Sequence, residues 1–228
     1  MAILNTMFSS QGVSASSAGS TTTLYIDKDD DNYGIGEGLT FHADAEDNIA
    51  IGENALNSTS GAALQNIAIG TNALTTVNAG DYNIAIGLGA GKLLEGGAAN
   101  TILGTSAGDA FDDESHNTII GYSAAGGALS ANDLVVIGAS ALVGAATQDG
   151  TVAIGRNALY ALTGGDGNVA IGKSALAGIN DGLRNTVIGY EAMLTANGDE
   201  HNNVAIGYKA MTLMDNNDTE QNVAIGSL

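Results

Sequence analysis

The chain has 228 residues but no cysteine, no proline and no tryptophan, and only 4% of its residues are aromatic. The absence of cysteine excludes disulfides, thiolate metal sites and cysteine nucleophiles. It also means that the sequence does not indicate whether the protein's compartment is oxidising or reducing. Hydrophobic residues still make up 44% of the chain, so the apolar content is mainly Ala, Ile, Leu and Val. Because such small side chains fill little volume, this composition favours a narrow rod over a thick globule.

Basic residues are also scarce. Six Lys and Arg oppose 25 Asp and Glu, which gives a formal net charge of −19. This balance argues against binding to nucleic acid, which needs clustered cations, and against adsorption to an anionic membrane. The first residues, MAILNTMFSSQGVSASSAG, have no basic segment and no long apolar core, so they do not resemble a signal peptide. No stretch approaches the roughly 20 apolar residues of a membrane helix, so we expect no membrane insertion.

Glycine, in contrast, is abundant, and many of the 33 glycines close a repeated motif. The motif ends at Gly52 and recurs at intervals of 18, seven times 17, 18 and 19 residues, up to Gly226. Ile precedes the glycine in ten of eleven repeats, Asn lies four residues before it in nine, and Ala lies three residues after it in all ten complete repeats. The positions that define the repeat include Asn48, Ile51, Gly52, Ala55, Asn66, Ile69, Gly70, Ala73, Ile86, Gly87, Ala90, Ile171, Gly172 and Ala175. Such strict recurrence predicts a stack of similar structural units over residues 48–228.

Each repeat is expected to contain a β-strand, because β-branched residues recur in it with a spacing of two. In the copy from Asn83 to Gly87, Ile84 and Ile86 share one face, and Ala85 lies on the other. A strand with no clearly polar face is usually buried on both sides. One face is therefore expected to line the coil and the other to need a partner. Since the Ala85 face lacks polar cover, we expect the motif to need a neighbour there as well as a core.

The segments between these strands are polar, variable and rich in Asp, Asn and Gly, which is typical of turns and loops. One repeat should thus run through a strand, a turn, a short second strand and an acidic loop. A single repeat cannot bury its apolar face, so the repeats must stack. At about 4.8 Å between strands, eleven repeats span roughly 50 Å. The Asn side chains would then form a ladder of amides that hydrogen-bond to one another.

Substitutions within the motif suggest compensation in the core. Where the β-branched position is Thr, the central Ala becomes larger, as in the pairs Thr101 with Ile102, Thr118 with Ile119 and Thr186 with Val187. The Ala that lies three residues after the glycine is usually followed by Leu or Met. Where a small residue replaces this Leu or Met, a large residue follows three or four positions later: Gly91 with Leu94, Gly108 with Phe111, and Ala125 with Leu129. We interpret both patterns as conservation of packed volume.

The motif N-[IVT]-A-I-G-x-x-A-L, repeated about every 17 residues, resembles the repeats of bacteriophage tail fibres and related virion appendages. It is also similar to the shorter head repeats of trimeric autotransporter adhesins, which form a trimeric β-roll. The resemblance covers residues 48–228. It implies an all-β, repetitive β-solenoid or β-roll that assembles as a parallel homotrimer, intertwined or side by side. It further implies a non-enzymatic, rigid rod on the virion, either an external appendage or part of the capsid surface.

Partners follow from the same resemblance. They are two further copies of the chain, other virion proteins that residues 1–47 would contact, and a host-surface receptor. Residues 1–47 lack the repeat and are expected to form an attachment or capping segment. A bacterial surface adhesin is the alternative function, although the lack of a signal peptide argues against it.

An enzymatic alternative comes from Ile51-Gly52-Glu53-Asn54-Ala55-Leu56, which fits the hexapeptide signature of β-helix acyltransferases. That fold needs an aliphatic residue every six positions, and the two positions that follow Ile69 at this spacing are Thr75 and Asp81. His116 and His201 have the same place in their repeats, each before an Asn, but lie five repeats apart, which is roughly 24 Å at one strand spacing per repeat. They cannot share one site within a chain, and no catalytic residue is predicted.

Two further motifs resemble active-site signatures. Gly104-Thr105-Ser106-Ala107-Gly108 matches a nucleophile elbow, but it is also an in-register copy of the repeat. The stretch from Gly87 to Lys92 superficially resembles a phosphate-binding loop, with the wrong spacing and Leu93 where Ser or Thr is required.

One acidic stretch has the spacing of a calcium loop. Asp27, Asp29 and Asp31 alternate as calcium ligands do, yet Asn32 stands in place of the turn glycine and Gly38 in place of the closing Glu. We read the stretch mainly as a solvated acidic turn. Ca²⁺ at these three residues is a weak candidate, and no other metal or cofactor is expected.

Overall fold

The computed structural model describes residues 13–17, 20–26, 30–57, 61–127, 130–144, 147, 149–196, 200–212 and 220–228. All regular structure in this part of the chain is β-structure, so the predicted all-β class is confirmed. None of the described residues belongs to a helix that is long and apolar enough to cross a membrane.

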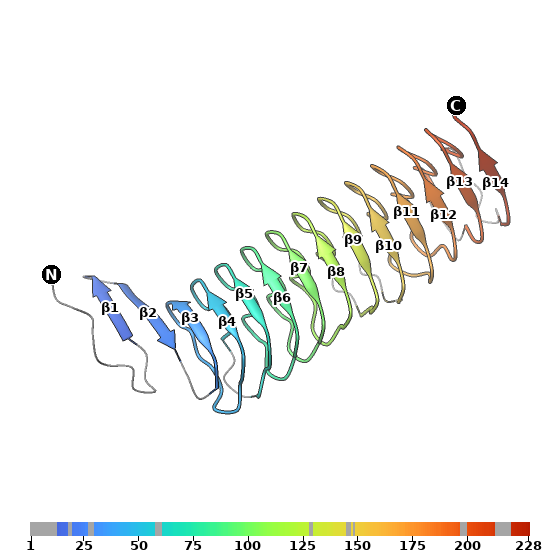
Figure 1. Ribbon diagram of the computed structural model, residues 1–228. Helices are drawn as coiled ribbons and strands as arrows, with labels where there is room; N and C mark the ends of the chain where they lie inside the picture. Colours follow the sequence, from blue (N-terminus) through green and yellow to red (C-terminus); the bar gives the residue numbers. More distant parts are fainter. Residues whose placement is uncertain are drawn as a thin grey trace.

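Within the described residues, fourteen strands form one continuous sheet in chain order (Figure 1). The first two strands pair antiparallel, β2 also pairs antiparallel with β3, and every later pair is parallel. From β3 onward the chain thus advances by one strand per turn, and β3 and β14 lie at opposite ends of the stack (Figure 1). The strands are β1 (Val13–Ser17), β2 (Ser20–Ile26), β3 (Tyr33–Gly36), β4 (Ile49–Ile51), β5 (Ile67–Ile69), β6 (Ile84–Ile86), β7 (Thr101–Leu103), β8 (Thr118–Ile120), β9 (Val135–Ile137), β10 (Val152–Ile154), β11 (Val169–Ile171), β12 (Thr186–Ile188), β13 (Val204–Ile206) and β14 (Val223–Ile225).

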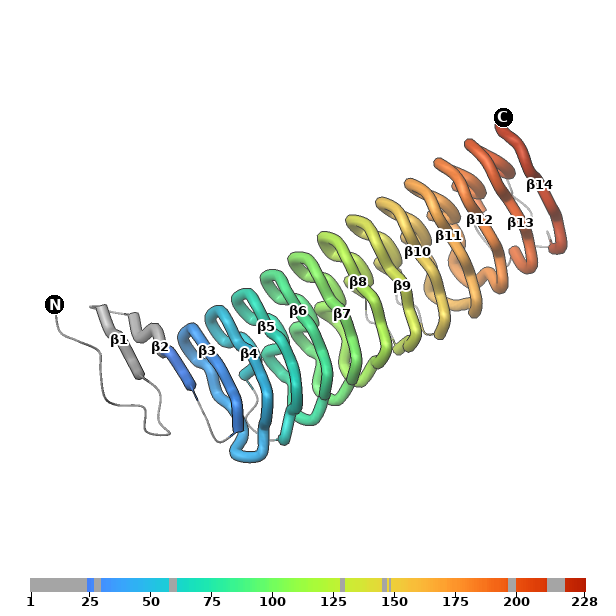
Figure 2. Tube along the Cα trace, viewed as in Figure 1, coloured from blue at the N-terminus to red at the C-terminus, as the bar shows by residue number. Residues whose placement is uncertain are grey.

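Strands β4 to β14 are the eleven repeats read from the sequence, and each pairs with the same positions of the next. Ala68, for example, pairs with Ala85 across β5 and β6, and Ala153 pairs with Ala170 across β10 and β11. The tube in Figure 2 shows these coils stacked as successive turns of similar outline. The predicted β-solenoid with rungs of about 17 residues is therefore confirmed.

The return half of each coil differs from the prediction, because it contains turns and no second strand in the described residues. Asn54 and Leu56 have φ of 53° and 47°, and the equivalent pair Asn72 and Leu74 has φ of 58° and 48°. Alternating left-handed residues curl the backbone instead of extending it. Hydrogen bonds still join the coils there, for instance from the amide of Leu56 to the carbonyl of Ala73 at 2.9 Å.

The core is a thin column inside the coils, built from one strand residue and two residues of the return half. In the coil of β5 these are Ala68, Ala73 and Leu74, all fully buried. Of the two predicted compensation patterns, the one that follows the small residue is present, since Phe111 is fully buried together with Ile102, whereas Thr101 faces outward and exchanges no core volume with Ile102. A Cβ atom built on Gly108 would lie 3.4 Å from Ile102 Cδ1 and 3.5 Å from Phe111 Cδ2, so these two side chains occupy the space left by the missing Leu. Leu129 lies outside the described residues.

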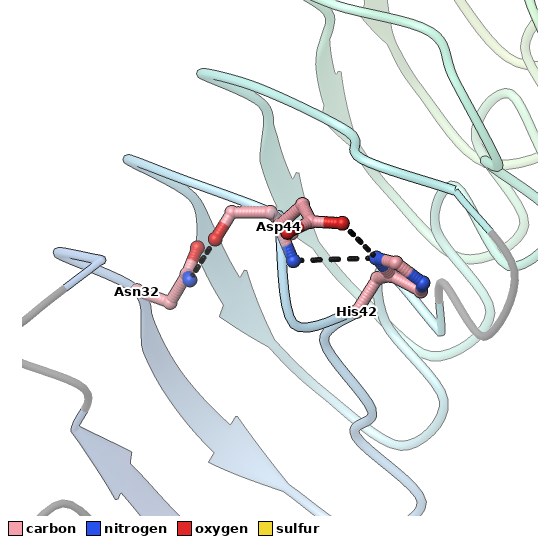
Figure 3. Close-up of polar contacts among 4 residues, drawn as sticks. Asn32, His42 and Asp44 are labelled. Carbon is pink, nitrogen blue, oxygen red and sulfur yellow. Dashed lines mark hydrogen bonds and ion pairs between the residues drawn. The ribbon is translucent and has the colours of Figure 1, made fainter.

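The coil begins before the first full sequence repeat, at Asn32 and β3. The side chain of Asn32 accepts a hydrogen bond from the amide of Asn48 at 3.1 Å and donates one to the carbonyl of Ala45. Figure 3 shows this contact next to the pair His42 and Asp44, whose Nδ1 and Oδ2 atoms are 3.6 Å apart. The segment YGIGEG is therefore a rung of the stack, although its sequence is degenerate.

Candidate functional site

The most distinctive surface of the rod is the outer face of the sheet, which we call the sheet face. It is formed by the first and third residue of each strand from β3 to β14, in two straight columns. The first column contains Tyr33, Ile49, Ile67, Ile84, Thr101, Thr118, Val135, Val152, Val169, Thr186, Val204 and Val223. The second contains Ile35, Ile51, Ile69, Ile86, Leu103, Ile120, Ile137, Ile154, Ile171, Ile188, Ile206 and Ile225. No charged residue occurs in either column.

The structure overturns the prediction that the Ala85 side of the strand needs a neighbour. Ala85 is fully buried inside the coil, and it is Ile84, 37% exposed, that faces outward. The reason lies in the return half, where residues such as Leu74 project into the coil and leave room for only a small side chain on the strand. The unpartnered face is therefore the Ile face, and it is more apolar than the one predicted.

The sheet face is a large apolar patch for the surface of a single chain. Eleven strand spacings of about 4.8 Å and three residues of about 3.3 Å give a strip roughly 50 Å by 10 Å, on the order of 500 Å². Ile51, Leu103 and Ile188, from different parts of the strip, remain 39%, 42% and 36% exposed. A contiguous apolar patch of this order is at the upper end of what monomeric proteins expose, and larger ones mark interaction sites.

Near its first rungs, the sheet face is hollowed. A pocket of about 160 Å³ lies over β2, β3 and β4, and it is lined almost entirely by apolar atoms. Leu24 pairs with Ile35 and Ile26 with Tyr33 in the antiparallel register, so β2 extends the apolar strip by one strand. Leu24 and Ile26 of β2 thus continue the same surface.

Inside the coil, the predicted amide ladder is present. Asn83 Oδ1 accepts hydrogen bonds from the backbone amide and the side-chain amide of Asn100, at 3.0 Å and 2.9 Å. Asn83 Nδ2 donates to the carbonyl of Gly97, 2.8 Å away, and so closes its own coil. Asn48, Asn66, Asn83, Asn100, Asn117, Asn168, Asn185 and Asn203 are all almost fully buried. The ladder ties each coil to the next and satisfies buried backbone groups.

The ladder is interrupted once, where Leu134 and Thr151 replace Asn. Asn117 Oδ1 still accepts the amide of Leu134 at 2.9 Å, but Asn117 Nδ2 and Thr151 Oγ1 are buried without a hydrogen-bond partner. Buried polar atoms of this kind cost about 1–3 kcal/mol each. These two rungs are consequently the weakest place in the amide ladder.

We expect Asn100→Ala to lower the free energy of unfolding by about 2–5 kcal/mol, because it leaves two buried groups unpaired. These groups are the amide of Asn117 and the carbonyl of Glu114, whereas Asn83 Oδ1 keeps its hydrogen bond from the backbone amide of residue 100. Urea denaturation followed by circular dichroism measures the loss. Asn180→Ala is the control, because Asn180 is exposed and outside the ladder. Equal losses in the two variants would contradict a structural role for the ladder.

A second ladder, not predicted from the sequence, runs two positions before the Asn column. Each side chain of this ladder accepts a hydrogen bond from the backbone amide of the residue at the same position one coil earlier. Ala98 donates to Ser115 Oγ at 3.0 Å, Asn132 to Asp149 Oδ1 at 2.7 Å, and Leu183 to His201 Nδ1 at 3.0 Å. The residues of this ladder are of different types. The only signal in the sequence is therefore that the position two residues before the Asn often carries a side chain that can accept a hydrogen bond.

This ladder also corrects the reading of the histidines. His201 belongs to the second ladder, whereas His116 is exposed and occupies the next position, which has a positive φ of 62°. The two residues therefore do not share a phase, because the longer loop before Asn203 shifts His201 by one position relative to the ladder. They remain in separate coils.

The other candidate sites can now be placed. Asp27 and Asp29 lie outside the described residues, and Asp31 is exposed, so Ca²⁺ at this turn stays a prediction. The described residues contain no group of three or more His, Asp or Glu that could hold a metal ion. Ser106 lies in the return half beside the buried Ala107. Its backbone amide donates to the carbonyl of Leu88, as the repeat requires.

Comparison with known proteins gives no relative for this chain. No protein-family model, no curated protein and no solved structure matches it.

Proposed function

We propose that this chain is a structural protein of a virion, a bacteriophage tail fibre or related appendage that acts as a rigid homotrimeric rod. The observation that carries the proposal is the sheet face, an uncharged apolar strip that runs along the whole stack of an otherwise acidic chain. A second copy of the same strip is complementary to it in length, spacing and chemistry. Supporting the virion assignment is the resemblance of the repeat to those of phage fibres.

The number three rests on the resemblance of the repeat to those of phage fibres. The face is only three residues wide, so three chains could direct their strips towards one axis and bury both columns. The resulting contact is shared with two neighbours and excludes water from all exposed Ile side chains. Burial of the strip on this scale would favour association through the hydrophobic effect.

The role of such a rod would be geometric. Parallel strands in register, two polar ladders and a packed core hold the coils at a fixed spacing, which resists bending and proteolysis. The acidic loops keep neighbouring rods apart through like-charge repulsion. The part of the N-terminal residues 1–47 that precedes the first coil at Asn32 would dock the rod to other virion proteins, and a host-surface receptor would be the distal partner.

Light scattering of the purified full chain tests the assembly. We expect three times the chain mass of 22.7 kDa over a wide concentration range. A monomer at every concentration would defeat the trimer proposal.

The location is tested separately, with gold-labelled antibodies raised against the chain. Electron microscopy should show label on fibres or on the surface of phage particles from the source culture. Label confined to bacterial cells would favour the adhesin, and turnover of acyl-CoA donors by the purified chain would favour the acyltransferase.

A further inference from the structure

A second surface runs parallel to the sheet face, along the corner that follows the strand glycine of each coil. The residue after this glycine has the same place in every coil. Its carbonyl accepts a hydrogen bond from the backbone amide of the second residue after the glycine in the next coil. Ser140 donates to Tyr122, Asn157 to Ala139, Ser174 to Arg156, Glu191 to Lys173, and Lys209 to Tyr190. We call the column Tyr122, Ala139, Arg156, Lys173, Tyr190 and Tyr208, with the adjacent Glu191 and Lys209, the corner ridge.

The corner ridge concentrates positive charge on an acidic rod. The chain has only six Lys and Arg, and three of them, Arg156, Lys173 and Lys209, lie on this ridge. Earlier in the same column stand Glu37 and Glu53, and no cation. Attraction to an anion is thus local, within about a Debye length of these side chains, and confined to the later half of the column.

Its aromatic side chains are arranged for contact. The rings of Tyr190 and Tyr208 stack with centroids 5.5 Å apart and an angle of 9° between their planes. Lys173 Nζ lies 5.1 Å from the centroid of Tyr190, and Lys209 Nζ lies 5.5 Å from that of Tyr208. The ammonium groups are therefore oriented by the rings before any ligand arrives.

One acid belongs to the ridge and remains charged. Glu191 Oε2 is 3.3 Å from Lys209 Nζ. A hydrogen bond from Tyr190 and the nearby Lys209 hold the pKa of Glu191 below its ordinary value, and the hydrogen bond to Glu191 raises the pKa of Lys209. The ridge thus presents acceptors as well as cations and phenol hydroxyls.

The ridge also has a gap in its column of large side chains. Tyr122 is 64% exposed, the next coil offers only the methyl group of Ala139, and Arg156 follows one coil later. Two coil spacings separate the Tyr122 and Arg156 backbones, roughly 10 Å. A saturated six-membered ring placed over Ala139 would take the place of the missing side chain, between the coils that carry Tyr122 and Arg156.

We propose that the corner ridge binds an acidic polysaccharide, a linear polymer of carboxylated pyranose sugars. A sugar ring lies over Ala139, and its carboxylate and that of a following sugar pair with Arg156 and Lys173. The planar guanidinium suits a carboxylate because it can donate two parallel hydrogen bonds. Sugar hydroxyls donate to Glu191, a contact that a polyphosphate cannot make because it has no hydroxyl donors along its chain. This inference needs the solenoid fold but not the virion assignment, so either can fail without the other.

Binding of a hexamer of uronic acid to the full-length chain, measured by titration calorimetry, tests the proposal. Replacing both cations, Arg156→Gln with Lys173→Gln, should weaken binding at least about tenfold, because two charge-assisted contacts are lost. The double variant Lys92→Gln with Arg184→Gln removes the same charge away from the ridge. It should change the affinity by less than about twofold, since distant exposed charges are screened by salt.

Filling the gap gives an independent test without a change of charge. Ala139→Tyr should abolish the binding, and Leu88→Tyr, in the same column outside the ridge, should leave it unchanged. Both variants should fold, because the column already carries Tyr at three positions. The proposal is overturned if the wild-type chain does not bind the hexamer, if a neutral glucan hexamer or polyphosphate binds as tightly, or if the matched controls lose as much affinity.

Discussion

Gly104→Ala is expected to lower the free energy of unfolding by about 3 kcal/mol or more, through backbone strain and a steric clash together. Gly104 has φ of 140°, in a region that residues with a side chain rarely adopt. A Cβ atom there would collide with the carbonyl oxygen of Gly121 and would lie 2.7 Å from its carbonyl carbon. Neither atom can move aside, because the next coil is fixed by its own hydrogen bonds.

A matched control lies in the preceding coil. Gly89 also has a positive φ, 65°, but the nearest atom to an added Cβ is Ser106 Oγ at 4.0 Å. Gly89→Ala should therefore cost only about 1–2 kcal/mol, the ordinary penalty of a left-handed conformation. Urea titration of both variants, followed by circular dichroism, measures the difference. If the two substitutions cost the same, contact between successive glycines does not determine the spacing of the coils.

The same reasoning applies along the whole column of strand glycines. From Gly52 to Gly226, φ at these positions ranges from 129° to 146°. Each glycine before the last approaches the backbone of the next one so closely that no side chain fits. This approach explains why the motif ends in glycine in every repeat before the last, and at Gly226 only the φ of 146° disfavours a side chain.

The sequence was sufficient to predict the stack, because the residues that set it are restricted to few types. Only glycine tolerates the close approach at Gly104, and only an amide such as that of Asn83 both donates and accepts within the ladder. Their recurrence every 17 residues therefore reveals the length of a coil. The predicted ladder of amides follows from the same restriction.

Which face of the strand points into the coil could not be predicted in the same way. Alternation shows that Ile84 and Ile86 share a face, but not whether that face points inward. The decision depends on volume brought by the return half, where Leu74 fills the coil, and this half was expected to be a strand. The corner ridge is equally invisible in the repeat, because its function depends on residues such as Arg156 and Tyr190 that differ from coil to coil.

The strongest effect on assembly is expected from charge on the sheet face. Ile137→Glu with Ile171→Glu should convert the proposed trimer into a monomer, a threefold fall in mass by light scattering. Association would bury two carboxylates per chain without partners, at a cost of several kcal/mol each. Because both side chains point out of the coil, the single chain should keep its fold, and its strand signal in circular dichroism should be unchanged.

Ala62→Glu with Ala79→Glu adds the same charge at exposed loop positions and should leave the trimer intact. This control separates burial of the sheet face from general repulsion between acidic rods, which added salt would screen. A trimer that persists with both glutamates on the sheet face would place the interface elsewhere. Unfolding of that variant would instead mean that Ile137 and Ile171 support the coil itself. Only a folded monomer is consistent with a face whose apolar side chains are there to meet other copies of the chain.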